Sequence, residues 1–301
     1  MSMDSNQSRN ESEHFHRLPN PPSSFDALPE SGSSPAAVLL RHLRLLGAML
    51  KIRLGRQMMY RASFWTAFFV DGTLFLVQLA IFSTLFLNVE SVNGWSQEQM
   101  VFFVGTFSLV DGLEMCFYFF GLISLPEKIR DGKLDLYLTK PVNPLFFLSF
   151  ESIDVGSALL TLPGIVMVVW ATMKMGISVT PLLVIGYLFL LVLMLLLLYD
   201  LVLLMRCAAF WFTRTDALGE LEGELMGFTF RVPGVVFQGA MKTILYVLLP
   251  YALLATIPTQ FFTGILNGRE WLSTLAVTLA FTLLARFVWK QGLKRYGSTG
   301  S

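Results

Sequence analysis

Long apolar stretches separated by short polar segments make up most of the chain from residue 62 onward. An α-helix needs about 20 apolar residues to cross the roughly 30 Å hydrocarbon core of a membrane, and stretches near this length recur along the chain. The pattern predicts six transmembrane helices, at 62–87, 100–125, 145–173, 181–205, 243–262 and 271–289. In the fifth, Pro250 and Pro258 each remove a backbone donor and are candidate breaks, and residues 257–264 are a candidate for a segment that turns back.

The chain before the first predicted span falls into two parts. Residues 1–35 are rich in Ser, Asn, Pro and Glu and show almost no apolar clustering, so a disordered tail is expected. Residues 36–60 combine leucines at steps of three and four with basic residues on another face: Leu39, Leu43, Leu46 and Leu50 against Arg41, Arg44 and Lys51. This periodicity predicts an amphipathic helix that lies in the lipid headgroup layer. The alternative is a soluble core helix, but a predicted span follows directly.

Lys and Arg residues are distributed unevenly along the predicted loops. They gather before the first span, between the second and third, after the fourth and after the sixth, whereas residues 88–99 contain neither. Because short cytoplasmic loops carry the excess of Lys and Arg, both termini and the loop at 126–144 are predicted to be cytoplasmic. The expected fold is an all-α polytopic membrane protein with a tail at 1–35 and one domain at 36–301, which holds the interface helix and the six spans.

The composition supports this class and excludes several others. Of the 301 residues, 54% are hydrophobic and 14% are charged, compared with about 25% charged residues in soluble domains. Cys116 and Cys207 fall in or beside predicted spans, so neither a disulfide framework nor a metal site is expected. The sequence contains no phosphate-binding loop with its lysine and no nucleophile elbow. We therefore expect no catalytic residue, no cofactor and no nucleic-acid partner, and any ATP hydrolysis is expected in a separate subunit.

Acidic residues inside the predicted spans are candidates for function. Asp71 lies in the first span, and Asp111 and Glu114 lie in the second, three residues apart and on one helical face. A charge at the centre of a bilayer costs at least about 2.5–3.5 kcal/mol, so these groups should face protein or water. One hypothesis is that they line a translocation path. The alternative is that the acids in the spans join neighbouring helices, with Arg206 or Arg286 as partners; this set also includes Glu151, Asp154 and Asp200. For Glu151 and Asp154, exposure to the lipid headgroups is a further alternative.

Residues 213–239 form a polar segment between the fourth and fifth predicted spans. The segment contains several glycines and three closely spaced acids, Glu220, Glu222 and Glu224. Two interpretations stay open: a second cytoplasmic contact surface, or a solvated connection.

The densest polar run between two spans is the loop at 126–144, with the sequence PEKIRDGKLDLYLTKPVNP. Asp131 and Gly132 predict a turn, and two prolines close the run. Residues 129–144 resemble the loop of the ABC type-2 permeases, the membrane subunits of ATP-binding cassette exporters, and more narrowly a bacterial subfamily with the pattern IxxGxLDxxLxxP. The matching positions are Ile129, Gly132, Leu134, Asp135, Leu138 and Pro141. Weaker agreement at 94–99, 249–258 and 292–298 extends the resemblance over about residues 41–298.

The resemblance implies a function and a mechanism. A permease of this kind forms a dimer with itself or with a related permease, and each copy binds an ATPase subunit at the bacterial cytoplasmic membrane. The matching loop residues are then expected to form the coupling element, with Ile129, Leu134 and Leu138 filling a groove on the ATPase. Two other classes stay open: a stand-alone secondary transporter or channel that uses the intramembrane carboxylates, and a membrane scaffold without transport.

Overall fold

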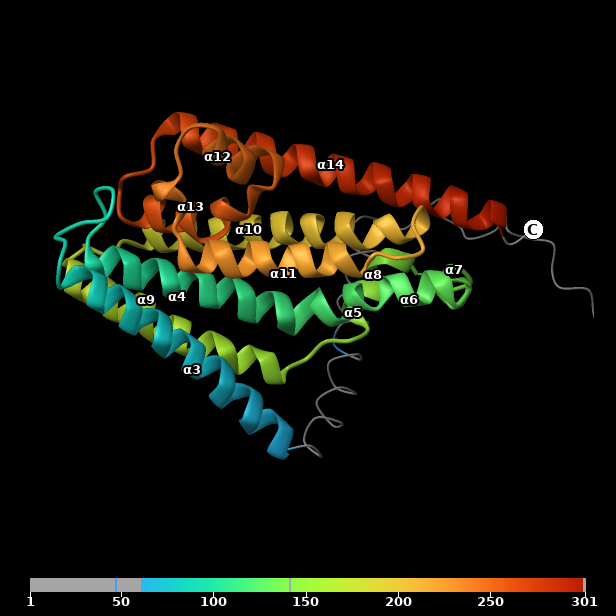
Figure 1. Cartoon of the computed structure of the whole chain (residues 1–301), viewed down its shortest axis with the longest axis horizontal. Helices are drawn as coiled ribbons and strands as arrows, with labels where there is room; N and C mark the ends of the chain where they lie inside the picture. Colours follow the sequence, from blue (N-terminus) through green and yellow to red (C-terminus); the bar gives the residue numbers. More distant parts are fainter. Residues whose placement is uncertain (1–46, 48–60, 141, 300–301) are drawn as a thin grey trace, which may run out of the picture. The chain divides into compact units, whose positions relative to one another are not determined.

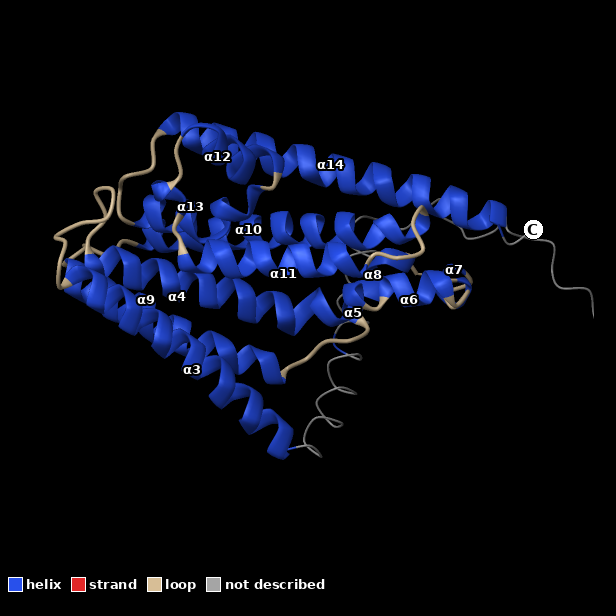
Figure 2. Ribbon diagram, viewed as in Figure 1, coloured by secondary structure: helices blue, strands red, loops and turns tan. Residues whose placement is uncertain are grey.

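The computed structural model describes residue 47, residues 61–140 and residues 142–299. Side chains are described for these residues except at positions 61–68, 70, 71, 74, 75 and 297–299. The predicted tail at 1–35 and, apart from Gly47, the predicted interface helix at 36–60 lie outside the described residues. Every regular element in the described ranges is a helix, which agrees with the predicted all-α class (Figure 1, Figure 2).

Long helices alternate with short helical segments along the described chain. The α-helices are α3 (Arg61–Phe86), α4 (Gln97–Glu114), α5 (Phe120–Ile123), α6 (Leu125–Arg130), α7 (Asp135–Leu138), α8 (Pro144–Phe150), α9 (Thr161–Met175), α10 (Pro181–Cys207), α11 (Asp216–Arg231), α12 (Gly239–Thr243), α13 (Leu253–Phe262) and α14 (Gly268–Thr299). The π-helical turns are η1 (Met115–Phe119) and η5 (Ile244–Leu248), and the 3-10 turns are η2 (Gly156–Leu160), η3 (Ala208–Phe210), η4 (Gly234–Val236) and η6 (Pro250–Ala252).

Four described helical runs are long and apolar enough to cross a membrane: Gln97–Arg130, Val155–Met175, Pro181–Phe210 and Gly268–Tyr296. They confirm the second, fourth and sixth predicted spans, and the second continues through η1 and α5 into α6, past its expected end at residue 125. The first predicted span coincides with α3, of which Leu76–Phe86 is a shorter apolar helix. Six spans with both termini in the cytoplasm stay a prediction.

The third predicted span begins later than expected, at Val155 rather than at residue 145. The residues before it form the short helix α8 and then a break. In this break the Asp154 N–H donates to the Cys116 carbonyl of η1, 2.9 Å away, and the Asp154 carboxylate accepts from Ser157. The break thus satisfies a carbonyl of the π-helical turn. The apolar residues of α8 conceal the break in the hydropathy pattern.

The fifth predicted span is a bent pair of helical segments rather than a straight helix. The leg at 239–248 meets the leg at 250–262 at an angle of 82°. The bend confirms Pro250 as a break, because proline has no N–H to continue the helical hydrogen bonds. Pro258 lies inside α13, which continues through it to Phe262. The chain turns again at Thr263 and Gly264, directly after α13 and at the end of the segment where a turn was expected.

The polar segment at 213–239 is not confined to the predicted cytoplasmic end. Its central part is α11, which runs antiparallel to α10 (Figure 1) and packs on α4 through Phe230 and Phe107, whose ring centroids are 5.0 Å apart. Beyond α11, the Val235 carbonyl accepts a hydrogen bond from the Asn93 side chain, in the loop between α3 and α4. This loop lies at the end of the bundle opposite residues 126–144 (Figure 1), so residues 213–239 run along the bundle and do not form a single loop at one end.

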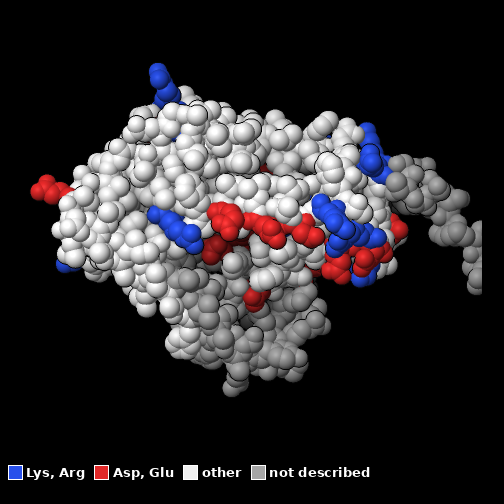
Figure 3. Space-filling model, viewed as in Figure 1, with Lys and Arg blue, Asp and Glu red and all other residues white. Residues whose placement is uncertain are grey.

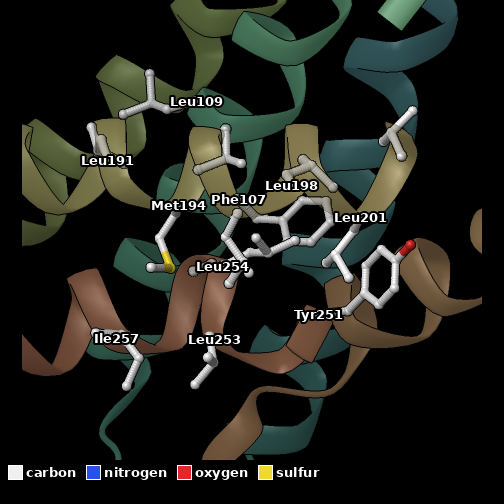
Figure 4. Packing of buried hydrophobic residues seen from close by; sticks show 14 of the residues in the cluster. Phe107, Leu109, Leu191, Met194, Leu198, Leu201, Tyr251, Leu253, Leu254 and Ile257 are labelled. Atoms are coloured by element: carbon white, nitrogen blue, oxygen red, sulfur yellow. The ribbon is translucent and has the colours of Figure 1, made fainter. Parts of the chain in front are cut away.

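Helix α4 lies at the centre of the hydrophobic core. It packs against α9, α10 and α13, and Figure 4 shows Phe107 of α4 beside Met194 and Leu198 of α10 and Leu254 of α13. All four of these side chains are buried. The arrangement fixes the part of α4 that carries Asp111 and Glu114.

Two glycines allow α4 and α9 to approach closely. A Cβ added to Gly105 would lie 2.9 Å from the Gly164 carbonyl oxygen, and a Cβ added to Gly164 would lie 2.7 Å from the Gly105 carbonyl oxygen. Small residues at such crossings let helix backbones pack against each other inside a membrane. The crossing of α4 and α9 therefore depends on the absence of side chains at this pair.

We expect Gly164→Ala to lower the free energy of unfolding by about 1–3 kcal/mol, because overpacking forces the two backbones apart. The matched control is Gly227→Ala in α11, where an added Cβ meets no atom within 4 Å and alanine favours the helix. Thermal unfolding of the purified protein in detergent measures both changes. Equal melting temperatures for the two variants would contradict the packing argument.

Candidate functional site

The loop at 126–144 forms a helix–turn–helix at one end of the described bundle (Figure 1). Helix α6 ends at Arg130, Gly132 adopts a φ of +69°, and α7 follows. This left-handed backbone conformation favours glycine, while the space around a Cβ at Gly132 is open. Gly132 is therefore needed for the backbone turn itself and not to avoid a neighbouring group.

The apolar residues of the loop mostly face the protein's own core. Leu134 is fully buried within the hydrophobic core, and Ile129 and Leu138 are half-buried. This burial corrects the expectation that Leu134 fills a groove on a partner, because the side chain instead anchors the loop to the helical bundle. The exposed apolar residue is Leu136, with 65% of its surface accessible. Pro141 lies outside the described residues.

The Glu151 carboxylate, in the break after α8, contacts both helices of the loop and holds them together. It forms an ion pair with Lys128 of α6 and accepts a hydrogen bond of 2.7 Å from the Tyr137 hydroxyl of α7. Lys128 also donates to the Ser124 hydroxyl at 2.9 Å. Burial and the hydrogen bond to Glu151 raise the pKa of Tyr137 above its usual range. The sequence had suggested only headgroup exposure or helix contacts for Glu151, and the structure makes it the link between α6 and α7.

The outer face of the loop carries exposed charges of both signs around Leu136. We define it by five of the loop's exposed residues, which are Asp131, Lys133, Asp135, Leu136 and Thr139. Lys133 pairs with Asp131 at 2.7 Å, and this hydrogen bond raises the pKa of Lys133. Exposed pairs of this kind add little stability. Figure 3 shows basic and acidic side chains gathered together at this end of the bundle, so the outer face is both charged and accessible.

The C-terminal part of α14 braces the loop from the side. Tyr296 hydrogen-bonds with Asp135, and the Phe210 ring of η3 lies 6.4 Å, centroid to centroid, from the Tyr296 ring. Gly292 leaves room for Phe210, because a Cβ there would overlap the ring. Asp135 therefore connects the loop with the last helix, a contact that the sequence pattern did not indicate.

Asp111 and Glu114, which their spacing predicted to share one helical face, both line a cavity. The cavity has a volume of about 250 Å³ and lies between the run from α4 to α5 on one side and α10 and α11 on the other. Glu114 is buried, and Asp111 is partly exposed. The side chain of Asp71 lies outside the described residues, so only two of the three predicted path residues are placed.

An ion pair that the sequence pattern did not reveal closes the far wall of this cavity. Arg206 of α10 and Glu222 of α11 approach to 2.6 Å between Nη2 and Oε2, and both residues are buried. The spacing of Glu220, Glu222 and Glu224 could have indicated that Glu222 differs from the other two, because residues two apart on a helix point in nearly opposite directions. Glu222 thus faces inward, while Glu220 and Glu224 are exposed.

Other predicted acids join helices instead of lining the cavity. Asp200 of α10 accepts a hydrogen bond from Thr282 of α14, which confirms the interpretation of this residue as a helix contact. Among the described residues, no group of three or more His, Cys, Asp or Glu side chains is arranged to hold a metal ion.

The comparison with protein families identifies the chain. The model of the ABC-2 family transporter proteins matches residues 73–300, which covers most of the chain and all described helices from within α3 onward. The protein belongs to the ABC-2 transporter family. Comparisons with curated proteins and with solved structures return no match.

Family membership fixes the general role of this ABC-2 protein. It is a multi-pass membrane protein and a transporter permease, in agreement with its apolar helices. ABC-2 membrane proteins are transporter components that are generally not catalytic themselves and that work with ATPase partners. The stand-alone transporter and scaffold interpretations are therefore not favoured.

We expect Glu151→Ala to loosen the loop, since Lys128 and Tyr137 lose their common partner. Backbone amides at 133–139 should exchange with deuterium at least about tenfold faster, because hydrogen bonds to charged groups contribute about 1.5–3 kcal/mol. Glu127→Ala is the control, since Glu127 is exposed and its only described ion pair is a long one, 3.8 Å between Glu127 Oε1 and Lys133 Nζ. Unchanged exchange in Glu151→Ala would show that this clamp does not hold the loop.

Proposed function

We propose that this protein is the membrane-spanning permease subunit of an ATP-binding cassette exporter in the bacterial cytoplasmic membrane, and that a separate ATPase drives it through residues 126–144. The match to the ABC-2 family carries the proposal. The clamped loop with its exposed outer face supports it, because a rigid surface can transmit a push. In this proposal residues 36–301 form the permease domain and residues 1–35 a cytoplasmic tail.

The topology in this proposal has six crossings, with both termini in the cytoplasm. The crossings are α3, the run from α4 to α6, α9, α10, α11 and α14, and the bent pair at 239–262 stays at the outer end. Arg231 and Lys242 then join Lys174 and Arg269 outside. The cytoplasmic end still holds the larger set: Lys128, Arg130, Lys133, Lys140, Arg214, Lys290, Lys294 and Arg295. The excess of Lys and Arg on that side supports the orientation.

Single cysteines test this topology in a background that lacks Cys116 and Cys207. An impermeant thiol reagent added to intact cells should label Asn93→Cys and Gln238→Cys, and should leave Lys133→Cys unlabelled until the cells are opened. All three positions are exposed. Labelling of position 133 from outside would overturn the orientation. A position 238 that is protected in intact cells but labelled in opened cells would exclude α11 as a crossing.

The coupling role is proposed for the outer face and its supports together. Leu136 is the apolar anchor that meets the ATPase, flanked by Asp135. Ile129, Leu134 and Leu138 hold the loop on the helical bundle, and Gly132 sets its turn; Pro141 closes the segment. Because α6 continues α4 with little interruption, a displacement of the loop acts directly on the span that carries Asp111 and Glu114.

We expect Leu136→Ala to reduce the amount of ATPase that co-purifies with the permease by at least about fivefold, since interface energy concentrates in a few apolar anchors. Lys133→Ala is the control at the rim of the same face and should change retention less than about twofold. Leu134→Ala should instead lower the permease's own melting temperature, because a buried leucine is lost. Full ATPase retention and full transport in vesicles for a well-expressed Leu136→Ala variant would refute the coupling surface.

The translocation path is proposed to run past Asp71, Asp111 and Glu114. The cavity beside Asp111 and Glu114 supports this path.

The transporter is proposed to assemble as a dimer of this permease with a second copy or a related permease. Polar groups on α11, including Glu220 and Glu224, are exposed along the bundle (Figure 3) and need water or a partner within a membrane. This need supports an assembled transporter larger than one chain.

A further inference from the structure

The cavity between α4 and α11 holds a buried carboxylate without a partner. Glu114 is only 3% exposed, and within the described part of the chain it makes neither a hydrogen bond nor an ion pair; its electrostatic neighbours are Asp111, Glu222 and Arg206. Buried polar groups in folded proteins are nearly always hydrogen-bonded, so an exception needs a cause. The Glu114 side chain lines the cavity, where a ligand can reach it.

Among the described residues that line the cavity, three are acidic (Asp111, Glu114 and Glu222) and one is basic (Arg206). Arg206 pairs with Glu222 at 2.6 Å, which leaves the charge of Glu114 without a cation of its own. Glu222 Oε2 is also buried without accepting a hydrogen bond of good geometry. A buried charge is costly unless it is paired. One positive charge with N–H donors, placed in the cavity, would satisfy both carboxylates.

The other walls of the cavity are apolar and partly aromatic. Met115 and Phe119 come from the π-helical turn η1, Ile123 comes from α5, and Met226 comes from α11 on the opposite side. Such π-helical turns within α-helices occur frequently at functional sites, and aromatic rings attract organic cations. The volume of about 250 Å³ exceeds that of an apolar cavity of about 150 Å³ that holds benzene. It therefore accommodates a ring-sized apolar body together with a charged group.

We propose that this cavity binds a small monovalent organic cation, an amine with an apolar body, with Glu114 as its counter-ion and Glu222 as a second acceptor. The transported substrate class is accordingly small organic cations, which is the part that rests on the proposed transport function. An inorganic ion is a poorer occupant, because no metal-binding group is found among the described residues and the apolar walls offer it no ligands.

The test measures equilibrium binding to the purified full-length permease in detergent at pH 7. The probe is tritiated 2-phenylethylammonium, and the competitor is 2-phenylethanol, which has the same shape without the charge. We expect saturable binding of the cation and competition at least about tenfold weaker by the alcohol. Glu114→Gln, which keeps the shape of the side chain, should raise the Kd at least about tenfold. Glu224→Gln, an exposed acid on α11 outside the cavity, should change it less than about twofold.

Three results would overturn the proposal: no saturable binding of the cation, equal competition by the alcohol, or unchanged binding in Glu114→Gln. The last would mean that Glu114 is a neutral helix contact. Gel filtration and melting temperature verify that each variant is folded. Because no ATPase takes part, a failure here leaves the permease function standing, and a failure of ATPase coupling leaves this measurement unaffected.

Discussion

The ion pair between Arg206 and Glu222 is the interaction on which the arrangement of the helices depends. It joins α10 to α11 inside the bundle and so allows an acidic helix to lie among apolar ones. Gly219 packs against the pair, because a Cβ there would lie 2.7 Å from Arg206 Nη1 and would shift the guanidinium group. Without a partner, either charge would have to leave the bundle or stay buried at a cost of several kcal/mol. Once α11 is held in this way, Phe230 meets Phe107 and the cavity beside Glu114 has its second wall.

The same requirement, that buried polar groups find partners, explains the loop at 126–144. Glu151 is partly buried and receives both Lys128 and Tyr137, so α6, α7 and the break after α8 form one unit. Leu134 is buried between this unit and the rest of the hydrophobic core. This unit is joined to α4 by nearly continuous helix. The outer face is therefore connected to Glu114 through nearly continuous helical backbone and packed side chains.

The hydropathy pattern predicted those parts of the fold where apolar length alone decides the structure. The second, fourth and sixth spans agree with the helices, and Pro250 does break the fifth. The pattern did not indicate that 213–239 runs along the bundle, because α11 is stabilised by one specific pair rather than by average hydropathy. The pattern also placed the start of the third span inside α8. The residues there are apolar, but they form a short separate helix that is not part of the span. Within the loop, the matching pattern located the segment, but it could not tell that Leu134 points inward while Leu136 is exposed.

The central claim is that an ATPase acts on this permease at the outer face of the loop. The most direct measurement is site-specific photo-crosslinking in native membranes, with benzoylphenylalanine placed at position 136 and, as a control, at position 93 at the opposite end of the bundle. The account predicts a crosslink from position 136 to a subunit that mass spectrometry identifies as an ATP-binding cassette ATPase, and none from position 93. A well-expressed permease that gives no ATPase crosslink from position 136, or an equal one from position 93, would contradict the account.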